Sequence, residues 1–305
     1  MTILESLKLN TEKLKSFSAT PRLDTEALLC FVLDKEKEFL FTYPKTKLNL
    51  SQSGRLNKAI KLRIKGVPIA HIVGHKEFYG YDFCVNENVL VPRPETELIV
   101  EEVLREVAEL QDSKTTRQLD NQTNGIILID VGTGSGCIPI TIANELTKEN
   151  KPTNNLQIFA IDISKKALFI AKKNANLYKL DDKIKFFEGN LLEPILPIFD
   201  QENGKKYIIT ANLPYLTPEQ VENSPTIRQE PVLALVAGKD GLQYYRELFE
   251  QIRSIKTDVK YVILCEIDAS QAESITQLIK EKLGNFKIEI NKDLAGLERL
   301  VVIKN

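Results

Sequence analysis

The chain has 305 residues but no tryptophan, one methionine, two histidines and four cysteines. With so few histidines and no two cysteines close together, we expect no zinc or other metal site. The cysteines stand in apolar stretches, which predicts four small buried thiols. No apolar run approaches the roughly 18 residues of a membrane helix. The first residues also lack the basic start and apolar core of a signal peptide. We therefore expect a cytoplasmic protein with no membrane contact.

An excess of charge of one sign is also missing. Lys and Arg number 41 and Asp and Glu 42, so the formal net charge is −1. This balance argues against binding nucleic acid by bulk charge. One stretch departs from it, because eight basic residues and no acidic ones lie after Phe39, up to and including Lys76. A solvated helix face and a docking surface for an acidic or RNA-associated partner both fit this stretch. We expect a monomer that needs no direct nucleic-acid contact.

Apolar residues recur at helical spacing through the first 75 residues. This spacing predicts three helices, over residues 4–14, 21–32 and 51–65. Ser51 is the expected N-cap of the third helix, since its hydroxyl can accept a hydrogen bond from a free backbone N–H. Residues 1–75 are therefore expected to form a helical domain.

The pattern changes after this helical segment. Aromatic and β-branched residues over 77–91 predict a hairpin that turns near residues 86–88. A helix is expected over 98–110, and the polar segment 111–125 reads as a loop. We therefore expect a hairpin linker over 76–93.

The rest of the chain, 94–305, alternates short apolar strands with amphipathic helices. We expect strands over 126–129, 158–161, 184–187, 207–210, 261–265, 286–290 and 299–303. Helices are expected over 137–146, 165–177, 242–255 and 271–283. Such alternation predicts an α/β domain with a doubly wound, mainly parallel sheet. The last two strands are expected to be antiparallel.

The first of these strands leads into a glycine-rich loop, Asp130-Val131-Gly132-Thr133-Gly134-Ser135-Gly136. Alternate glycines let the backbone turn tightly and approach a ligand, and the next helix offers free N–H groups. The spacing differs from the G-x-G-x-x-G of dinucleotide folds, which hold a pyrophosphate. It therefore favours S-adenosylmethionine over a nicotinamide cofactor. The expected binding residues here are Asp130, Gly132, Thr133, Gly134, Ser135 and Gly136, with Asp130 facing the ammonium group directly or through water.

Two more polar residues follow the next two strands. Asp162 can accept hydrogen bonds from both hydroxyls of a ribose, although a helix N-cap is the structural alternative. Any adenosine ligand would suit this carboxylate. Asn190 follows the third strand, where its amide can pair with the edge of an adenine. Both are candidate cofactor-binding residues.

Asn212-Leu213-Pro214-Tyr215 follows the fourth strand. It resembles the Asn-Pro-Pro-Tyr signature of methyltransferases that act on adenine N6, cytosine N4 or a glutamine amide. An amide nitrogen is a poor nucleophile because its lone pair is delocalised. The oxygen of Asn212 and the carbonyl of residue 213 can accept its two hydrogens and hold it facing the methyl group, while Tyr215 packs on the amide. All four residues are candidate catalytic residues, and Asn212 is also expected at the cofactor.

The sequence departs from this signature at Leu213, which stands in place of a proline. The φ angle that proline imposes is lost, but the carbonyl remains. Pro214 still restricts the residue before it. We therefore expect a working site that is less rigid.

Taken together, the motifs resemble the glutamine N5-methyltransferases of bacterial peptide chain release factors, over nearly the whole chain. The matching segments are 66–74 with Glu77-Phe78, 89–97, 130–136, Asp162, 212–215, Glu230-Pro231, Ala234-Leu235, Ala237-Gly238, 240–242, and 293–296 with Arg299. The resemblance implies a substrate-recognising helical domain, a hairpin linker and a class I methyltransferase domain. It also implies S-adenosylmethionine as methyl donor and the glutamine of the Gly-Gly-Gln motif of release factors as acceptor.

The resemblance further implies a set of residues on the substrate side, Arg93, Pro94, Glu95, Glu97 and Glu230. For Glu95 and Glu97 a structural linker is the alternative, with Thr96 or Glu97 capping the next helix. Asp268 stands where the family usually has glycine after Glu-Ile. We expect that departure to lie away from the glutamine site and to alter only the local backbone.

Other functions compete with this one. The same chemistry on a ribosomal-protein glutamine is the sister activity, and the N-terminal domain would discriminate between the two. A nucleic-acid adenine methyltransferase is disfavoured by the net charge of −1 and by the lack of a DNA-reading motif. A non-catalytic S-adenosylmethionine-binding module has only Leu213 in its support.

Overall fold

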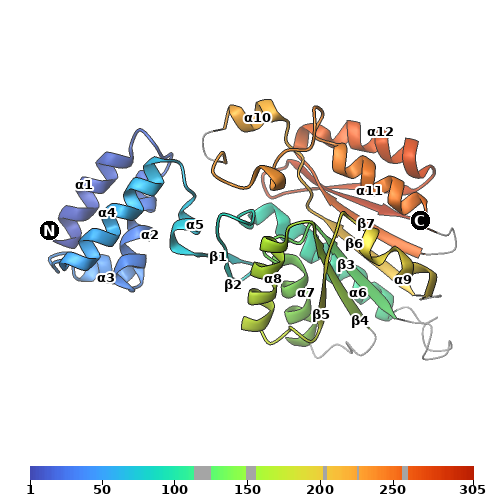
Figure 1. Cartoon of the computed structure of the whole chain (residues 1–305), viewed down its shortest axis with the longest axis horizontal. Coiled ribbons are helices and arrows are strands. Elements are labelled where there is room, and N and C mark those ends of the chain that lie inside the picture. Colours follow the sequence, from blue (N-terminus) through green and yellow to red (C-terminus); the bar gives the residue numbers. More distant parts are fainter. Residues whose placement is uncertain (113–124, 149–155, 202–204, 225–226, 256–259) are drawn as a thin grey trace.

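The computed structural model describes residues 1–112, 125–148, 156–201, 205–224, 227–255 and 260–305. Within these residues the chain forms a set of N-terminal helices, a two-stranded hairpin and a seven-stranded sheet with helices on both faces. Figure 1 shows the N-terminal helices in blue on one side of the molecule, followed by the hairpin and then the sheet.

The N-terminal helices are α1 (Ile3–Leu14), α2 (Pro21–Leu33), α3 (Lys37–Thr42), α4 (Leu50–Ile64) and α5 (Ile69–Val73). The three expected helices are confirmed, and the two short ones were not expected. Ser51 is not the cap of α4. Asn49 is the cap, because it accepts the N–H of Gln52 while the Gln52 side chain accepts the N–H of Asn49.

The hairpin consists of β1 (His75–Phe78) and β2 (Tyr81–Cys84), which are antiparallel. The expected turn near residues 86–88 is present, since the N–H of Val89 donates to the carbonyl of Asn86 at 3.2 Å, but residues 89–91 form no strand, so this turn does not close the hairpin. The turn that joins β1 to β2 is at Tyr79 and Gly80, whose φ angles are 53° and 74°. Two positive φ angles in a two-residue loop match the twist of paired strands. Tyrosine rarely adopts this conformation, which is why the sequence did not indicate a turn there.

The strands of the large sheet are β3 (Ile126–Val131), β4 (Leu156–Asp162), β5 (Ile184–Glu188), β6 (Lys206–Ala211), β7 (Lys260–Glu266), β8 (Lys287–Lys292) and β9 (Glu298–Lys304). Their order is β5-β4-β3-β6-β7-β9-β8. The first five run parallel, and β8 and β9 form the expected antiparallel pair. Since β3 lies between β4 and β6, the order reverses there, and such a switch point is where α/β sheets bind ligands.

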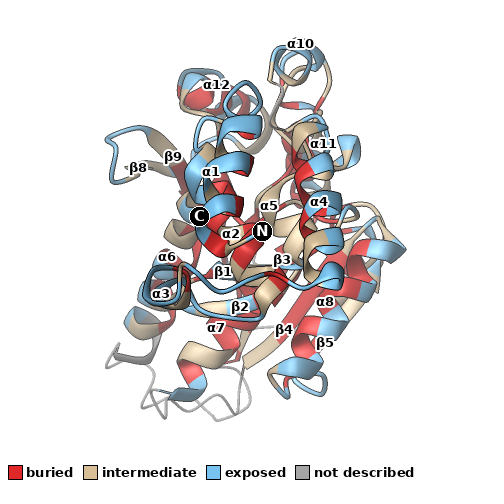
Figure 2. Ribbon diagram, turned by 90° about the vertical axis from the view of Figure 1, so that its left-hand side faces the viewer, coloured by how far each residue is buried: buried red, intermediate tan, exposed pale blue. Residues whose placement is uncertain are grey.

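The remaining helices are α6 (Glu97–Asp112), α7 (Cys137–Lys148), α8 (Lys165–Leu177), α9 (Leu196–Gln201), α10 (Pro218–Glu222), α11 (Gln243–Arg253) and α12 (Ala272–Leu283). One apolar core lies between the sheet and α6, α7 and α8, and the other between the sheet and α9, α11 and α12. Figure 2 shows the strands of the sheet largely in the red of buried residues. The expected α/β architecture is confirmed. Of the expected loop over 111–125, residues 113–124 lie outside the described residues.

The four cysteines are free thiols, but their burial differs. Cys137 and Cys265 are buried, whereas Cys30 and Cys84 are only half-buried. The expectation of four buried thiols was therefore wrong for two of them. Among the described helices, none combines the length and the apolar character needed to cross a membrane.

Asn174 of α8 joins the hairpin to the glycine-rich loop. Its side chain is fully buried, accepts the N–H of Cys84 at 2.8 Å and donates to the Cys84 carbonyl at 3.0 Å. It also donates to the carbonyl of Ser135 at 2.8 Å. One side chain therefore holds the end of β2 and the loop before α7 against the same helix.

Replacing Asn174 tests this link. Asn174→Leu leaves buried backbone groups without partners, and we expect it to lower the free energy of unfolding by about 2–4 kcal/mol. Denaturant unfolding measures the change. Asn176→Leu, on the exposed face of the same helix, is the matched control and is expected to change stability by less than about 0.5 kcal/mol. Equal losses in the two variants would contradict the proposed link.

Candidate active site

Two cavities lie at the carboxyl end of the parallel strands. The first, which we call the loop pocket, is lined by the glycine-rich loop and by the segments after β4, β5 and β6, namely 132–135, 162–164, 189–191 and 212–214. The second, which we call the interdomain cleft, lies between α5 and the segments that follow β6 and β7. Its walls include Pro68, Ile69, Arg93, Pro94, Glu95, Tyr215, Glu230, Asp268 and Arg299.

The two cavities share a wall. Asn212, Leu213 and Pro214 line both of them, and so does Arg93. A ligand in the loop pocket and a second one in the interdomain cleft would therefore meet at the tetrapeptide. This arrangement is suited to the transfer of a group from one ligand to the other.

The register of the sheet brings the binding segments to one level. Val131 pairs with Ile161 on one side and with Ala211 on the other. The residues that follow these three positions are Gly132, Asp162 and Asn212. All three leave the same edge of the sheet together, and all three line the loop pocket.

The glycine-rich loop keeps its backbone open toward this pocket. Gly132 and Gly134 have φ angles of 72° and 55°, which favour glycine. The N–H groups of Gly132 and Thr133 both donate to the carbonyl of Ile161 at 2.9 Å. A Cβ on Gly134 would have no heavy atom nearer than 4.0 Å, so a ligand can approach the backbone here. Ser135 also lines the pocket, and its side chain is almost fully buried.

Gly136 has a different role from the one predicted. It does not line the loop pocket, and a Cβ there would lie 2.9 Å from Cδ1 of Ile140 and 3.2 Å from Cβ of Ala171. Its φ of 79° also favours glycine. The residue therefore allows α7 and α8 to pack closely, which no pattern along the chain reveals.

Asp130 lies beneath the loop and does not line the pocket. Its side chain is 1% exposed, and Oδ1 accepts a hydrogen bond from Thr210 at 2.7 Å. Its other oxygen has no hydrogen-bond partner among the described residues. Burial raises the pKa of Asp130 to about 7. Of the two arrangements predicted, a direct contact with a ligand is therefore not available to Asp130, and contact through water remains.

Asp162 and Asn190 both line the loop pocket. Asp162 accepts the N–H of Gly134 at 2.9 Å and that of Ser164 at 2.8 Å, and burial raises its pKa. It is not the N-cap of α8, since the Ser164 hydroxyl accepts the N–H of Ala167. Asn190 donates to Glu193 at 3.4 Å, which is a long hydrogen bond.

Asn212 presents an unpaired acceptor at the shared wall. Its Nδ2 donates to the hydroxyl of Thr96 at 3.0 Å. Its Oδ1 is buried and has no hydrogen-bond partner among the described residues. A buried oxygen without a donor costs free energy, so such groups are uncommon unless a ligand completes them. The Oδ1 atom of Asn212 can therefore accept one hydrogen bond from a ligand.

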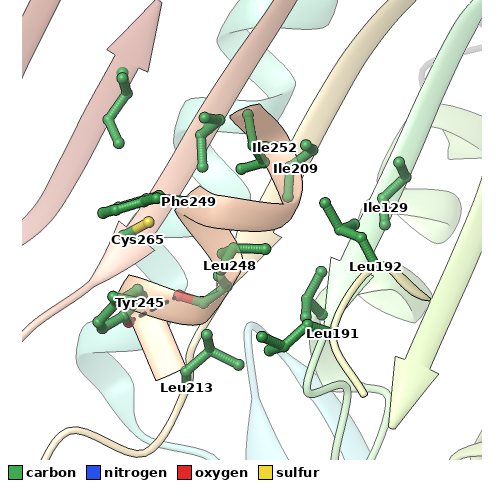
Figure 3. Close-up of a cluster of buried hydrophobic side chains, with 14 of the residues drawn as sticks. Ile129, Leu191, Leu192, Ile209, Leu213, Tyr245, Leu248, Phe249, Ile252 and Cys265 are labelled. Atoms are coloured by element: carbon green, nitrogen blue, oxygen red, sulfur yellow. Dashed lines mark hydrogen bonds between the residues drawn. The ribbon is translucent and has the colours of Figure 1, made fainter. Parts of the chain in front are cut away.

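The side chain of Leu213 packs into the core beside the shared wall. The residue is 3% exposed, and Figure 3 shows it close to Tyr245, Leu191 and Leu248. A Cβ on Gly132 would lie 3.0 Å from Cδ2 of Leu213, so the glycine also makes room for this leucine. The burial of this apolar side chain restricts residue 213, as the ring of a proline would otherwise do.

Tyr215 and Glu266 meet below the interdomain cleft. The Tyr215 hydroxyl donates to Oε1 of Glu266 at 3.4 Å, and burial raises the pKa of Glu266 to about 7. Glu266 ends β7, beside β6, and two residues further on Asp268 lines the cleft. The segment that we expected to lie away from the glutamine site therefore contacts Tyr215 of the tetrapeptide and lines the cleft. The pairing of β6 with β7 brings residues 266–268 next to the tetrapeptide.

The residues expected on the substrate side divide into two groups. Arg93, Pro94, Glu95 and Glu230 line the cleft. Glu230 is buried, binds Nη2 of Arg93 at 2.5 Å and accepts the N–H of Val91 at 3.0 Å. Glu97 lines neither cavity, because its carboxylate accepts the N–H of Tyr79 at 2.9 Å. That residue holds the hairpin turn to the start of α6.

The strand order, the glycine-rich loop after β3 and the polar residues after β4 and β6 define a class I methyltransferase domain, with a Rossmann-like sheet. A methyltransferase domain model matches residues 122–292, and a PrmC N-terminal domain model matches residues 5–74. A crystal structure of the hMettl16 catalytic domain in complex with the MAT2A 3′UTR hairpin 6 has the same fold. Its TM-score is 0.54 at 14% identity, over 91% of this chain and 92% of that one.

Full-length relatives identify the particular family. A release factor glutamine methyltransferase of Coxiella burnetii is 35% identical over 304 residues, which is 100% of this chain and 99% of that protein. The Bacillus subtilis protein of the same name is 32% identical over 98% of this chain and 96% of its own length. The chain belongs to the release factor glutamine methyltransferase family.

The raised pKa of Asp130 predicts how stability depends on pH. The usual pKa of such a carboxyl is 3.8, and in the folded protein it is about 7. The folded state therefore holds this proton more tightly, and the stability it provides is complete below about pH 3.8 and lost as the pH rises through about 7.

Asp130→Asn removes this titration. We expect the free energy of unfolding of the variant to fall less than that of the wild type between about pH 5 and 8. Denaturant unfolding at a series of pH values measures both curves. Glu266 gives the wild type a second decline in the same direction, so the variant curve becomes shallower but not flat. Two parallel curves would contradict the burial of an ionisable Asp130.

Proposed function

We propose that this protein transfers a methyl group from S-adenosylmethionine to the side-chain amide nitrogen of the glutamine in the Gly-Gly-Gln motif of peptide chain release factors. The observation that carries this proposal is the buried Oδ1 of Asn212, which has no hydrogen-bond partner in the described part of the chain and lies at the wall between two cavities. A planar amide entering from the cleft has the hydrogen that this oxygen lacks. The family to which the chain belongs supports the same reaction.

The loop pocket fits S-adenosylmethionine. The open backbone at Gly134 can face the amino-acid part, and Asp162 can accept hydrogen bonds from the ribose hydroxyls. Asn190 offers an amide to the adenine edge, and Ile163 and Leu191 give that side of the pocket apolar surface. When bound, this cofactor supplies an electrophilic methyl group on a sulfonium centre.

The protein's own groups position the acceptor amide. Asn212 Oδ1 would accept one hydrogen of the glutamine amide and the carbonyl of Leu213 the other. These two bonds orient the nitrogen toward the loop pocket and favour localisation of its lone pair. Tyr215, on the cleft side, would pack against the flat amide. No strong base is required, because the amide nitrogen still carries both hydrogens and a positive charge once the methyl group has moved, and this cationic amide is very acidic and releases one proton to water.

The interdomain cleft is the proposed place of the release-factor loop. Arg93 and Glu230 form an ion pair in its wall, and α5 closes the opposite side. Of the eight basic residues noted in the sequence, Arg63 is buried in a pair with Asp24 at 2.6 Å. Six others are exposed, at Lys45, Lys47, Arg55, Lys58, Lys61 and Lys65. We infer that they guide the substrate protein, and that a monomer acts in the cytoplasm, where translation ends.

Transfer of a labelled methyl group tests the substrate. Labelled S-adenosylmethionine is incubated with the enzyme and a purified release factor, beside a release factor with Gln→Ala in the motif and a ribosomal fraction. We expect label on the intact release factor and none on the mutant. Label only in the ribosomal fraction would assign the sister activity instead. No transfer with cofactor still bound would indicate a binding module.

Two substitutions separate the acceptor site from the cofactor site. Asn212→Ala is expected to lower kcat by about 10²–10³-fold with little change in cofactor Kd, since an oriented acceptor acts mainly in the transition state. Asp162→Ala is expected to weaken cofactor binding most. Steady-state kinetics and equilibrium titration give the two values, with Asn176→Ala as a surface control. Full turnover by Asn212→Ala would refute the account of amide positioning.

A further inference from the structure

Gln271 contacts the end of the tetrapeptide, and both ends of its side-chain amide are hydrogen-bonded to backbone groups. It ends the 3-10 turn Ala269–Gln271, which follows β7, and it is 7% exposed. Its Oε1 accepts the N–H of Asp268 at 3.1 Å. Its Nε2 donates to the carbonyl of Tyr215 at 3.0 Å and to that of Gly241 at 3.2 Å. We call this set of contacts the Gln271 junction. It joins the turn after β7 to the tetrapeptide and to the segment before α11.

The three backbone groups determine which way the amide of Gln271 points. A backbone N–H can only donate, and a carbonyl oxygen can only accept. The N–H of Asp268 therefore needs the oxygen of the amide, and the two carbonyls need its hydrogens. The reversed amide would lose all three hydrogen bonds. Gln271 lines neither cavity, so it can act on a ligand only through the backbone that it holds.

Gly241 allows the junction to form. Its φ of 71° favours glycine. A Cβ at this position would lie 2.2 Å from the carbonyl oxygen of Tyr215 and 2.5 Å from Nε2 of Gln271. Both distances are well below van der Waals contact, so a side chain at position 241 would push the three groups apart. The junction therefore depends on two independent features, the amide at position 271 and the missing side chain at position 241.

The junction holds the backbone close to the proposed acceptor site. The Leu213 carbonyl, which would accept one hydrogen of the substrate amide, is two residues before Tyr215. The ring of Pro214 fixes the φ angle between them, so few rotatable bonds separate the two carbonyls. On the other side of Tyr215, the N–H of Leu216 donates to the carbonyl of Leu235 at 2.9 Å. A shift of the Tyr215 carbonyl would therefore also displace the Leu213 carbonyl and the Tyr215 ring.

We propose that Gln271 is a positioning residue for methyl transfer, which holds the end of the tetrapeptide so that the Leu213 carbonyl and the Tyr215 ring face the acceptor amide. This inference rests on the proposed function, and it adds a residue from a separate part of the chain to the groups that arrange the acceptor site. Gln271 touches no reacting atom. Its loss should lower turnover, because misplaced groups orient the acceptor poorly, and should leave the cofactor pocket intact.

The first experiment replaces Gln271 with methionine, which has a similar length but no amide. We expect Gln271→Met to lower kcat for release-factor methylation by about 10- to 100-fold, as misplacement of a reacting group does. The Kd of the cofactor should stay nearly unchanged, because residue 271 is not in the wall of the loop pocket. A general loosening of the domain would weaken cofactor binding as well, so the two values together separate positioning from a loss of stability.

Gln52→Met is the matched control. Gln52 also accepts the N–H of the residue three positions earlier, Asn49, at 2.9 Å, but it belongs to α4 and lines neither cavity. Its substitution removes the same kind of capping hydrogen bond, and we expect kcat to be unchanged. A Gln271→Met enzyme with the kcat of Gln52→Met would overturn the inference.

Gln271→Glu tests whether the donated hydrogens matter. A carboxyl at this position keeps the oxygen that Asp268 needs, but only its protonated form has a hydrogen for the two carbonyls. We expect the kcat of Gln271→Glu to exceed that of Gln271→Met at acidic pH, and the ratio to fall as the pH rises. Asp130 and Glu266 titrate in both variants, so the ratio removes their effect. A ratio of one or less at every pH would contradict the role of these hydrogen bonds.

The second experiment tests the junction from its other side. Gly241→Ala places a Cβ against the Tyr215 carbonyl, and we expect kcat to fall by about 10-fold or more. The matched control is Gly284→Ala, because Gly284 also has a positive φ, 81°, but a Cβ there would meet no heavy atom within 4 Å. Both alanines strain the backbone, whereas only the first displaces Tyr215. Equal kcat values in the two variants would overturn the inference.

The outcomes separate the inference from the function that it extends. If Gln271→Met and Gly241→Ala keep the kcat of a wild type that methylates the release factor, the inference fails and the proposed function stands. If Gln271→Met does not fold, the comparison of the two alanine variants still decides. A wild type that labels no release factor would refute both the proposed function and this inference.

Discussion

The arrangement of the site depends on the parallel register of three adjacent strands. Because Val131 is level with Ile161 and Ala211, the chain leaves the sheet at the same height in all three places. Loops that are far apart in the sequence therefore begin side by side. The glycine-rich loop, the acidic residue after β4 and the tetrapeptide after β6 form one pocket without any of them having to be long. A displacement of one residue in either pairing would turn these side chains to the wrong face.

Much of the fold and of the candidate site could be predicted from the sequence, because both depend on local patterns along the chain. The alternation of strands and helices, the loop of glycines and the polar residues after the strands all depend on neighbours in sequence. The errors occurred where distant contacts decide. Glu266 joins the site only through the pairing of β7 with β6, and Gly136 is required by the approach of Ala171. Glu97 belongs to the hairpin because of Tyr79.

The leucine at position 213 shows how one constraint can replace another. A proline would restrict the backbone through its ring, whereas Leu213 is held by its burial beside Tyr245. The hydroxyl of Tyr245 shares its hydrogen between the backbone carbonyls of Glu266 and of Ala211, which is two residues before Leu213. The strand end and the start of the tetrapeptide are therefore held from the core side. The expectation of a looser site took account of the lost ring but not of this packing.

The contacts of Asn174 have a consequence for how the chain can change. It binds positions 84 and 135 through their backbone atoms, and their side chains take no part in those bonds. These bonds therefore place no demand on the residue type at positions 84 and 135, while they require an amide of this length at position 174. Contacts of this kind confine the selective pressure to one partner. Compensating double substitutions are then not expected among these three sites, although they are in direct contact.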